Sequence, residues 1–178
     1  MMKRILCTAL LIAAAAPAAA QGTGVECVAA TLSPEQLESL SARWISEEIG
    51  PMEVNDEIRP GIRSCIDRGV IVTQGQLDSS FVYAISVLEM FDYGKDLQSV
   101  GIDPSQIEGL WAKMPPALRS SVIAHTADQA PLPEEELKAY LAANSMADEN
   151  GKLGTALVFM LAIAGTVEAD RKFTEAKP

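Results

Sequence analysis

The sequence predicts an all-α protein: a single compact domain of six or seven helices packed around a hydrophobic C-terminal helix and stapled by one disulfide. Three observations support this fold class. Apolar residues recur at helical spacing along most of the chain, with capping residues and prolines where helices would start. No series of segments alternates apolar and polar residues as half-buried strands do. The charge-free stretch from Leu153 to Val167 is apolar on every side, which is typical of a helix with neighbours all round.

The N-terminal segment 1–20 has the composition of a cleaved signal peptide. Lys3 and Arg4 precede an apolar run from Ile5 to Ala16, and small residues from Ala18 to Ala20 close the segment. The apolar run is about a dozen residues long, too short to span a bilayer. We therefore expect cleavage after Ala20, export to the periplasm or the secreted space, and a mature chain of about 158 residues that folds as one domain.

Two cysteines, Cys27 and Cys65, remain once this segment and its Cys7 are removed. An even number of cysteines in an oxidising compartment predicts a structural disulfide, worth roughly 3 to 4 kcal/mol in the chain-entropy model. This bond would tie segment 21–31, which we expect to be extended, onto a helical domain covering 32–173. Two isolated cysteines and one histidine do not have the spacing of a zinc site, and widely separated cysteines are not typical of a redox pair.

The domain opens with amphipathic helices. Ser33-Pro34-Glu35-Gln36 combines a capping serine, a proline at the first helical position and a glutamine in capping-box register, so a helix begins there, and Gly50-Pro51 ends it. The next pattern places apolar residues four apart at Val54, Ile58, Ile62 and Ile66. Pro60-Gly61 interrupts this pattern, which predicts a kink or two short helices that meet at Arg59.

Gly69 ends the second pattern, and residues 70–72 form a short β-branched run that we expect to be a buried, extended connector. Asp78 then caps a strong helix that Gly94 ends. Its apolar residues, including Phe81, Val82, Ile85 and Leu88, occupy a wide face, the breadth expected of a helix covered on two sides.

Prolines and turn residues divide the rest of the chain. Asp103-Pro104 starts one helix, and Pro115-Pro116 ends it and starts another. Glu134, Glu135 and Glu136 follow a proline corner and favour the first turn of a further helix, where negative charge stabilises the helix dipole. Asn150-Gly151 precedes the final helix, and residues 174–178 are expected to form a flexible tail.

The stretch from Leu153 to Val167 has two interpretations. As a membrane anchor its roughly 15 uncharged residues rise only about 22 Å, short of the roughly 30 Å hydrocarbon core. As a core helix it has the advantage of Gly154 and Gly165, three turns apart, which form a small-residue stripe that lets neighbouring helices approach closely. We expect the core helix, in which a charge at Leu157 or Leu161 prevents folding.

His125 and Asp128 are the weak candidates for chemistry. His125, the one histidine, lies four residues from Ser121 and three from Asp128, and an imidazole near a carboxylate and a hydroxyl has the ingredients of a nucleophilic site. Three groups on one helix surface do not converge on a substrate, however, so we expect a helix-end histidine without a catalytic role. The acidic pairs 47–48, 56–57 and 148–149 lack the ligand spacing of a calcium loop, and we expect them to be solvated surface.

Composition restricts the function further. Of the 14 basic residues, 12 remain in the mature chain beside 24 acidic ones, a formal charge of −12, which disfavours binding to nucleic acids and anionic lipids. Because the sequence carries no catalytic, metal-binding or cofactor-binding motif, we expect a non-catalytic domain that binds another protein or the cell envelope.

Two alternatives remain open. One is a carrier that holds a small apolar ligand between its helices, suggested by Met90, Met114, Met146 and Met160. The other is an envelope protein anchored by Leu153 to Val167, with the basic residues that follow this stretch on the cytoplasmic side.

Overall fold

A computed structural model describes residues 22–144, 146 and 151–178, so the expected signal peptide, Asp148, Glu149 and Asn150 lie outside the described residues. Within the described ranges the chain is all-helical, as predicted, with seven α-helices, two 3-10 turns and no strand. These elements are η1 (Val25–Cys27), η2 (Ala29–Thr31), α1 (Pro34–Ile45), α2 (Pro51–Asp67), α3 (Gln74–Ser99), α4 (Pro104–Lys113), α5 (Pro116–Thr126), α6 (Glu134–Ala143) and α7 (Lys152–Glu175).

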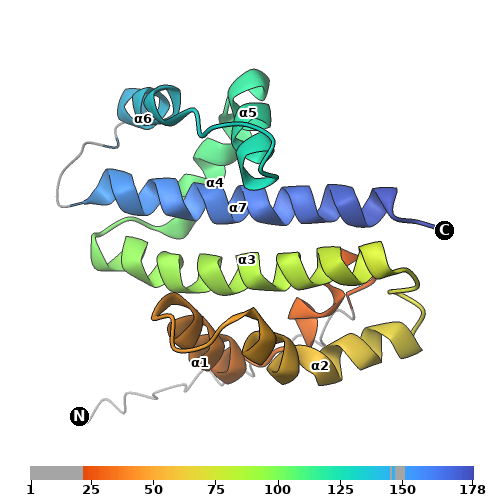
Figure 1. Cartoon of the computed structure of the whole chain (residues 1–178). Coiled ribbons are helices and arrows are strands. Elements are labelled where there is room, and N and C mark those ends of the chain that lie inside the picture. Colours follow the sequence, from red (N-terminus) through yellow and green to blue (C-terminus); the bar gives the residue numbers. More distant parts are fainter. Residues whose placement is uncertain (1–21, 145, 147–150) are drawn as a thin grey trace, which may run out of the picture.

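Two long helices, α3 and α7, lie antiparallel at the centre of the molecule, and the shorter helices cover them from two sides (Figure 1). Helices α1 and α2 and the 3-10 turns lie on the α3 side, while α4, α5 and α6 lie on the α7 side. The end of α7 is fastened to the start of α3, because Thr73 Oγ1 donates a 2.8 Å hydrogen bond to the carbonyl oxygen of Ala176. The C-terminal helix is therefore packed into the core, as predicted.

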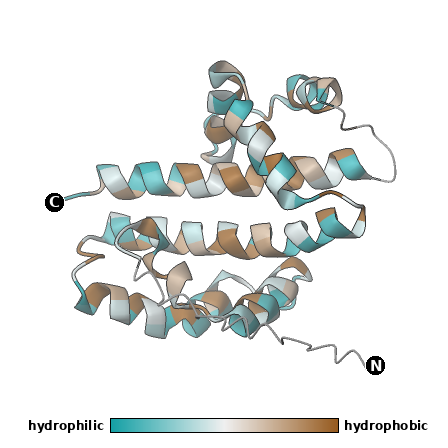
Figure 2. Ribbon diagram, turned by 180° about the vertical axis from the view of Figure 1, so that it is seen from behind, coloured by the Kyte–Doolittle hydropathy of each residue, from teal (hydrophilic) through white to brown (hydrophobic). Residues whose placement is uncertain are grey.

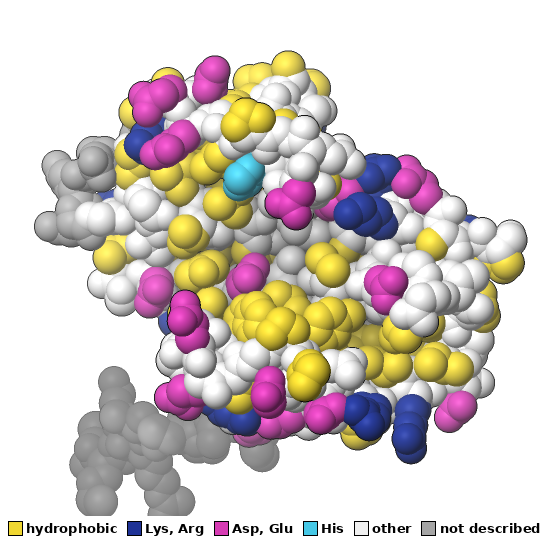
Figure 3. All heavy atoms as spheres, in the orientation of Figure 1, with side chains coloured by type: hydrophobic (Ala, Val, Ile, Leu, Met, Phe, Trp, Pro, Cys, Tyr) yellow, Lys and Arg dark blue, Asp and Glu magenta, His cyan; other side chains and the backbone are white. Residues whose placement is uncertain are grey.

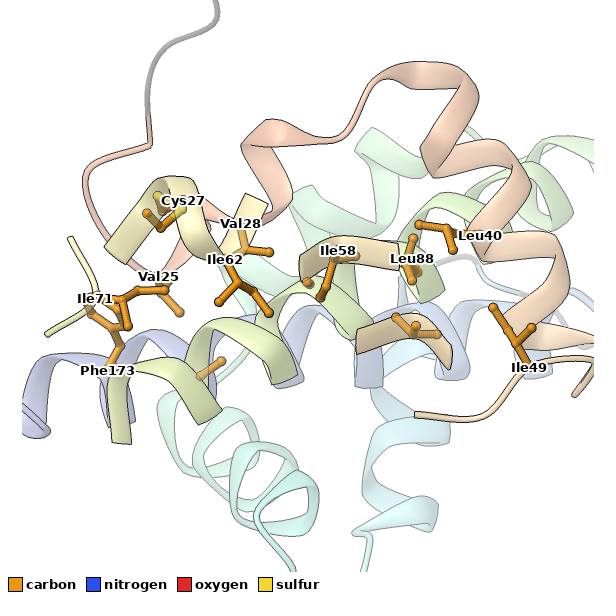
Figure 4. Packing of buried hydrophobic residues seen from close by; sticks show 14 residues of the cluster. Val25, Cys27, Val28, Leu40, Ile49, Ile58, Ile62, Ile71, Leu88 and Phe173 are labelled. Atoms are coloured by element: carbon orange, nitrogen blue, oxygen red, sulfur yellow. A yellow bond between two sulfur atoms is a disulfide. The ribbon is translucent and has the colours of Figure 1, made fainter. Parts of the chain in front are cut away.

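The buried apolar side chains form two clusters along the α3–α7 pair. The first joins η1, η2, α1 and α2 to the first half of α3 and the last turns of α7, and Val28, Ile58 and Leu88 belong to it (Figure 4). The second joins α4, α5 and α6 to the rest of both long helices, around the fully buried Ile107 and Met160. Hydrophobic residues accordingly recur along both long helices (Figure 2), and each of these helices contributes to both clusters.

The predicted disulfide joins Cys27 of η1 to Cys65 of α2, which are 38 residues apart in the sequence. The described part of segment 21–31 is not extended as expected but coiled into two 3-10 turns. These turns pair backbone groups locally, with Cys27 N donating to Gly24 O and Thr31 N donating to Val28 O. Because this segment buries apolar side chains in the first cluster, its backbone needs such internal partners.

Capping residues begin α1 and α4 as predicted. Ser33 and Gln36 form a complete capping box, in which Ser33 Oγ accepts a hydrogen bond from Gln36 N and Gln36 Oε1 accepts one from Ser33 N. Asp103 Oδ1 accepts a 2.9 Å hydrogen bond from Ser105 N at the start of α4. Both helices have a proline in the first turn, where the missing N–H would have no intrahelical partner.

The predicted start of α3 at Asp78 is wrong. The helix begins at Gln74, one turn earlier, because Thr73 and Gln76 form a capping box of the same kind as that of α1. Thr73 Oγ1 accepts a 3.2 Å hydrogen bond from Gln76 N, and Gln76 Oε1 accepts one from Thr73 N. Asp78 therefore lies inside the first turns of α3 and is exposed on its surface.

The predicted end of α3 at Gly94 is also wrong, since the helix continues to Ser99. Gly94 is buried, and a Cβ at this position would lie 3.6 Å from atoms of Phe159 in α7 and Pro104 in α4. This glycine thus occupies a close-packed part of the core instead of a turn. The left-handed turn that follows α3 is made by Gly101, with φ 77°.

Pro60 neither breaks α2 nor divides it into two helices. The helix is continuous from Pro51 to Asp67, with the proline on its exposed side. Gly61 beside it is buried, and a Cβ there would collide with Thr31 of η2, so this glycine serves a close approach between elements. Of the predicted apolar stripe, Val54, Ile58 and Ile62 are buried but Ile66 is 46% exposed.

Helix α7 is longer and less enclosed than expected. It continues past Val167 to Glu175, into the segment expected to be a flexible tail. By length and composition it could cross a membrane, and half of its apolar stretch is buried in the fold. Val158 and Val167 are 36% and 39% exposed, so the expectation of neighbours on every side is wrong for one face of the helix.

The two glycines of the predicted small-residue stripe have different surroundings. A Cβ at Gly165 would collide with Ser86 Oγ of α3 and lie 3.3 Å from Ser86 Cβ, so the two long helices approach closely there. A Cβ at Gly154 would meet no atom within 4 Å. The stripe therefore contributes to helix packing only at its Gly165 end.

Candidate functional site

His125 and Asp128 do not form a catalytic arrangement. His125 lies in the last turn of α5, partly buried, with Nδ1 3.2 Å from the carbonyl oxygen of Ala130. Ser121 is exposed, and its hydroxyl donates to Ala117 O within the same helix. Asp128 lies beyond the helix in a left-handed conformation, with φ 56°, and its side chain is exposed. No hydrogen bond joins the imidazole to the carboxylate or the hydroxyl among the described residues.

The acidic pairs 47–48 and 56–57 lie on the surface, and the second pair has ion-pair partners. Glu57 accepts a hydrogen bond from Arg43 of α1, and Asp56 pairs with Arg59 one turn further along α2. Over the residues that the structure describes, no three histidine, cysteine, aspartate or glutamate side chains come together as metal ligands would.

A groove lies over α3 and α7, and we call it the α3–α7 groove. It consists of two adjoining depressions of about 490 and 510 Å³ that share Val82, Thr126 and Gly165. Helix α1 and the start of α2 form one wall, and the end of α5 forms the other. The first depression is lined by the following residues: Trp44, Pro51, Phe81, Val82, Ile85, Ser86, Glu89, Tyr93, Thr126, Val158, Leu161, Ala162 and Gly165.

The lining of the groove is mainly apolar and open to solvent. Val82 of α3 is 48% exposed and Val158 of α7 is 36% exposed. A further depression shares Phe81 and Val82 with the groove and extends to Met52, which is 77% exposed. Hydrophobic side chains accordingly gather in the middle of the face that Figure 3 shows, between acidic side chains.

One stripe of α3 runs along the groove. Asp78, Val82, Ile85 and Glu89 follow one another at intervals of four, three and four residues and all line it. This spacing keeps side chains on one helix face. The stripe therefore has two apolar residues at its centre and a carboxylate at each end, separated along the helix axis by about 16 Å.

Glu89 is a partly buried carboxylate without a cationic partner among the described residues. Its Oε1 accepts a 3.3 Å hydrogen bond from Trp44 Nε1 of α1. Burial raises the pKa of Glu89 above its ordinary value, an effect that the Trp44 hydrogen bond partly offsets. Burial, together with the negative charges of Glu89, Asp92 and Asp96, likewise raises the pKa of the neighbouring Tyr93.

Glu168 is a more deeply buried carboxylate that, unlike Glu89, has cationic partners. It is 4% exposed and lies at the edge of the second depression of the groove. Arg171 donates to both of its oxygens, at 2.7 and 2.8 Å, and Lys172 lies 3.5 Å away. The hydrogen bonds from Arg171 lower the pKa of Glu168 below its ordinary value, so this carboxylate is charged and neutralised within the protein.

The sequence reasoning missed the groove because it assigned Val82 and Ile85 to a face of α3 covered by other helices. The signal that could have revealed it is the placement of Asp78 and Glu89 on the same face as these apolar residues. Carboxylates seldom lie on a fully buried face. An apolar stripe bounded by acidic residues at helical spacing is therefore better explained by a surface depression.

Comparison with known proteins gives no relative from which a function could be transferred. No protein-family model matches the chain, and no curated protein or solved structure shows significant similarity to it. The α3–α7 groove and the composition of the chain are therefore the features that bear on function.

Proposed function

We propose that this protein is an exported, non-catalytic domain that binds another protein through the α3–α7 groove. The single observation that carries this proposal is the exposed apolar lining of the groove, above all Val82 and Val158, which come from the two central helices. Exposed apolar side chains gathered in one depression mark interaction sites far more often than isolated ones do.

Export is supported by the order of residues in segment 1–20 and by the Cys27–Cys65 disulfide, a bond that persists in oxidising compartments. The expected N-terminus of the mature protein is Gln21. N-terminal sequencing of the protein released with the soluble extracytoplasmic contents tests both export and the expected N-terminus at Gln21. An uncut chain that remains with the cytoplasmic fraction would contradict export.

Binding through the groove is tested with a matched pair of variants. Val82→Lys places a charge in the groove, and Val72→Lys places the same charge at a 58% exposed valine that does not line it. Affinity isolation from envelope extracts should recover a partner with the wild-type chain and with Val72→Lys but not with Val82→Lys. A partner retained equally by both variants would exclude the groove as the binding surface, and Val158→Lys provides an independent check from α7.

The non-catalytic part of the proposal has its own test. Turnover of a hydrolase substrate panel by the purified mature chain, abolished by His125→Ala, would overturn it. The geometry around His125 leads us to expect no such activity, because its described hydrogen-bond partner is a backbone carbonyl.

The two alternative functions have less support. Met114 and Met160 are buried in the second cluster, Met90 and Met146 pack against it, and none of the four lines the groove, so their positions favour a role as core filling over ligand binding. An anchor formed by α7 would have to separate this helix from α3 and bring the buried Glu168 to the bilayer. Release of the protein without detergent would exclude the anchor.

A further inference from the structure

The charge pattern of the α3–α7 groove indicates what kind of partner it accepts. Glu89 lies where the groove passes Trp44, and Asp78 lies three helical turns away along the same face of α3. Val82 and Ile85 lie between them. A partner that fits this surface has apolar groups opposite the two central residues and positive charges opposite the two carboxylates.

Neither carboxylate has a cationic partner among the residues that the structure describes. Glu89 has only the neutral indole donor of Trp44, and Asp78 accepts a 2.7 Å hydrogen bond from the neutral amide of Gln74. Glu168, by contrast, is neutralised by Arg171 and Lys172. A partly desolvated carboxylate that lacks such a cation is best stabilised when a ligand supplies one.

The rest of the groove is also negative. Among the described residues, Glu89 is the one charged residue that lines the first depression, and the second adds Asp78 and Asp128 beside Glu168, which Arg171 and Lys172 neutralise. Over the part of the chain that the structure describes, Lys172 is the one basic residue that lines either depression, and it already lies beside Glu168. An anionic ligand would therefore meet uncompensated like charges, whereas a cationic one would be attracted.

The length of the groove favours a peptide over a compact ligand. Along α3 its lining extends from Gly75 to Tyr93, which corresponds to about 27 Å of helix, or five turns. The antiparallel helices α3 and α7 at the floor and the walls from α1 and α5 form a surface on which a further helix can lie.

We infer that the α3–α7 groove binds a basic amphipathic helix of a partner protein, in which two Lys or Arg side chains about three turns apart pair with Glu89 and Asp78 while two apolar side chains between them cover Val82 and Ile85. This inference rests on the proposed function and specifies the partner of the same site. A helix with a basic residue at position i, apolar residues at i+4 and i+7 and a second basic residue at i+11 presents all four on one face.

The test uses synthetic fluorescent peptides of about five turns with this pattern, added to the full mature chain and followed by anisotropy. The first peptide has two lysines eleven residues apart and two leucines between them. The second has the same composition, but its lysines are nine residues apart and so lie on opposite faces of the helix. In the third, both lysines are replaced by glutamate. We expect the first peptide to bind, the second to bind more weakly, and the third not to bind.

Variants of the protein test which carboxylates of the groove bind the first peptide. Glu89→Gln keeps an acceptor for Trp44 and should weaken binding of the first peptide by about tenfold or more, since a partly desolvated charged hydrogen bond is lost. Asp78→Asn, at an exposed position, should weaken binding by about two- to fivefold. Asp96→Asn removes the same charge from an exposed position of α3 outside the groove and should leave binding unchanged.

Several results would overturn the inference. Equal binding of the first peptide to the Glu89→Gln and Asp96→Asn variants would show that the groove charges do not select the ligand. Equal binding of the three peptides would show that neither charge nor spacing matters. Sedimentation that shows a dimer of the chain, lost in Val82→Lys, would assign the groove to a second copy.

These failures are distinguishable from failure of the proposed function. If no peptide binds but Val82→Lys still loses the natural partner, the groove remains a binding surface and only the basic helix is excluded. If Val82→Lys keeps the natural partner, the proposed function itself fails, whatever the peptides do.

Discussion

The close approach of α3 and α7 at Gly165 makes a quantitative prediction about two identical substitutions in one helix. Gly165→Ala introduces a methyl group that would collide with Ser86 Oγ and lie 3.3 Å from Ser86 Cβ. Gly154→Ala introduces the same group where no atom lies within 4 Å. Both variants gain helix propensity, but only Gly165→Ala must displace Ser86 and crowd the contact between the central helices.

The gain in helix propensity and the cost of overpacking determine whether each variant is more or less stable than the wild type. Replacement of a helical glycine by alanine stabilises a helix by roughly 0.5 to 1 kcal/mol. Overpacking of a tight interior contact costs about 1 to 3 kcal/mol. We therefore expect Gly154→Ala to raise the free energy of unfolding by up to about 1 kcal/mol and Gly165→Ala to lower it by about 0.5 to 2 kcal/mol.

Thermal and urea unfolding of the purified mature chain measure this difference. For a chain of this size each kcal/mol shifts Tm by about 2 to 4 °C, so the two variants should differ by roughly 3 to 10 °C. Ser86→Ala removes the colliding hydroxyl and should recover part of the loss in the double variant with Gly165→Ala, with a coupling above about 0.5 kcal/mol. If Gly165→Ala stabilises the protein as Gly154→Ala does, the close approach described for these helices is wrong.

Three further predictions concern stability. Met160→Asp buries a charge in the second cluster and should abolish cooperative unfolding monitored by circular dichroism. Leu161 is only partly buried, so Leu161→Asp should still fold, contrary to the expectation from the sequence. The reverse order would contradict the assigned faces of α7. Reduction of Cys27–Cys65 should cost about 3 to 4 kcal/mol, measured as the shift of the urea midpoint with dithiothreitol, and an unchanged midpoint would refute this. Because the folded-state pKa of Glu168 is lowered, the ionised carboxylate stabilises the fold above the pKa that Glu168 has in the unfolded chain. This stabilisation is lost as the pH falls through the folded-state pKa. The cost of Glu168→Gln, roughly 1 to 2 kcal/mol at pH 7, should therefore shrink in acid.

Local rules predicted most of the secondary structure. Ser33, Asp103 and the prolines that follow them specify helix starts through hydrogen bonds within a few residues, so the sequence alone contains the required information. The same rule applied to Thr73 and Gln76 would have placed the start of α3 correctly.

Glycines were less predictable because one residue type serves unrelated purposes. Gly101 makes a left-handed turn, whereas Gly61, Gly94 and Gly165 allow tertiary contacts with residues far away in the sequence. Local sequence does not distinguish a glycine that ends a helix from one that faces a neighbouring helix. The α3–α7 groove depends on tertiary structure in the same way, since its walls come from α1 and α5.

The membership of α3 and α7 in both hydrophobic clusters has a consequence for cooperativity. The disulfide lies in the first cluster, but a helix that spans both clusters cannot loosen at one end without weakening the other. The covalent constraint near the N-terminus therefore stabilises α4, α5 and α6 at a distance. A ligand that bridges the two long helices acts on the same cooperative unit, so occupancy of the groove should protect backbone amides from hydrogen exchange throughout the domain, including those of helices the ligand never touches.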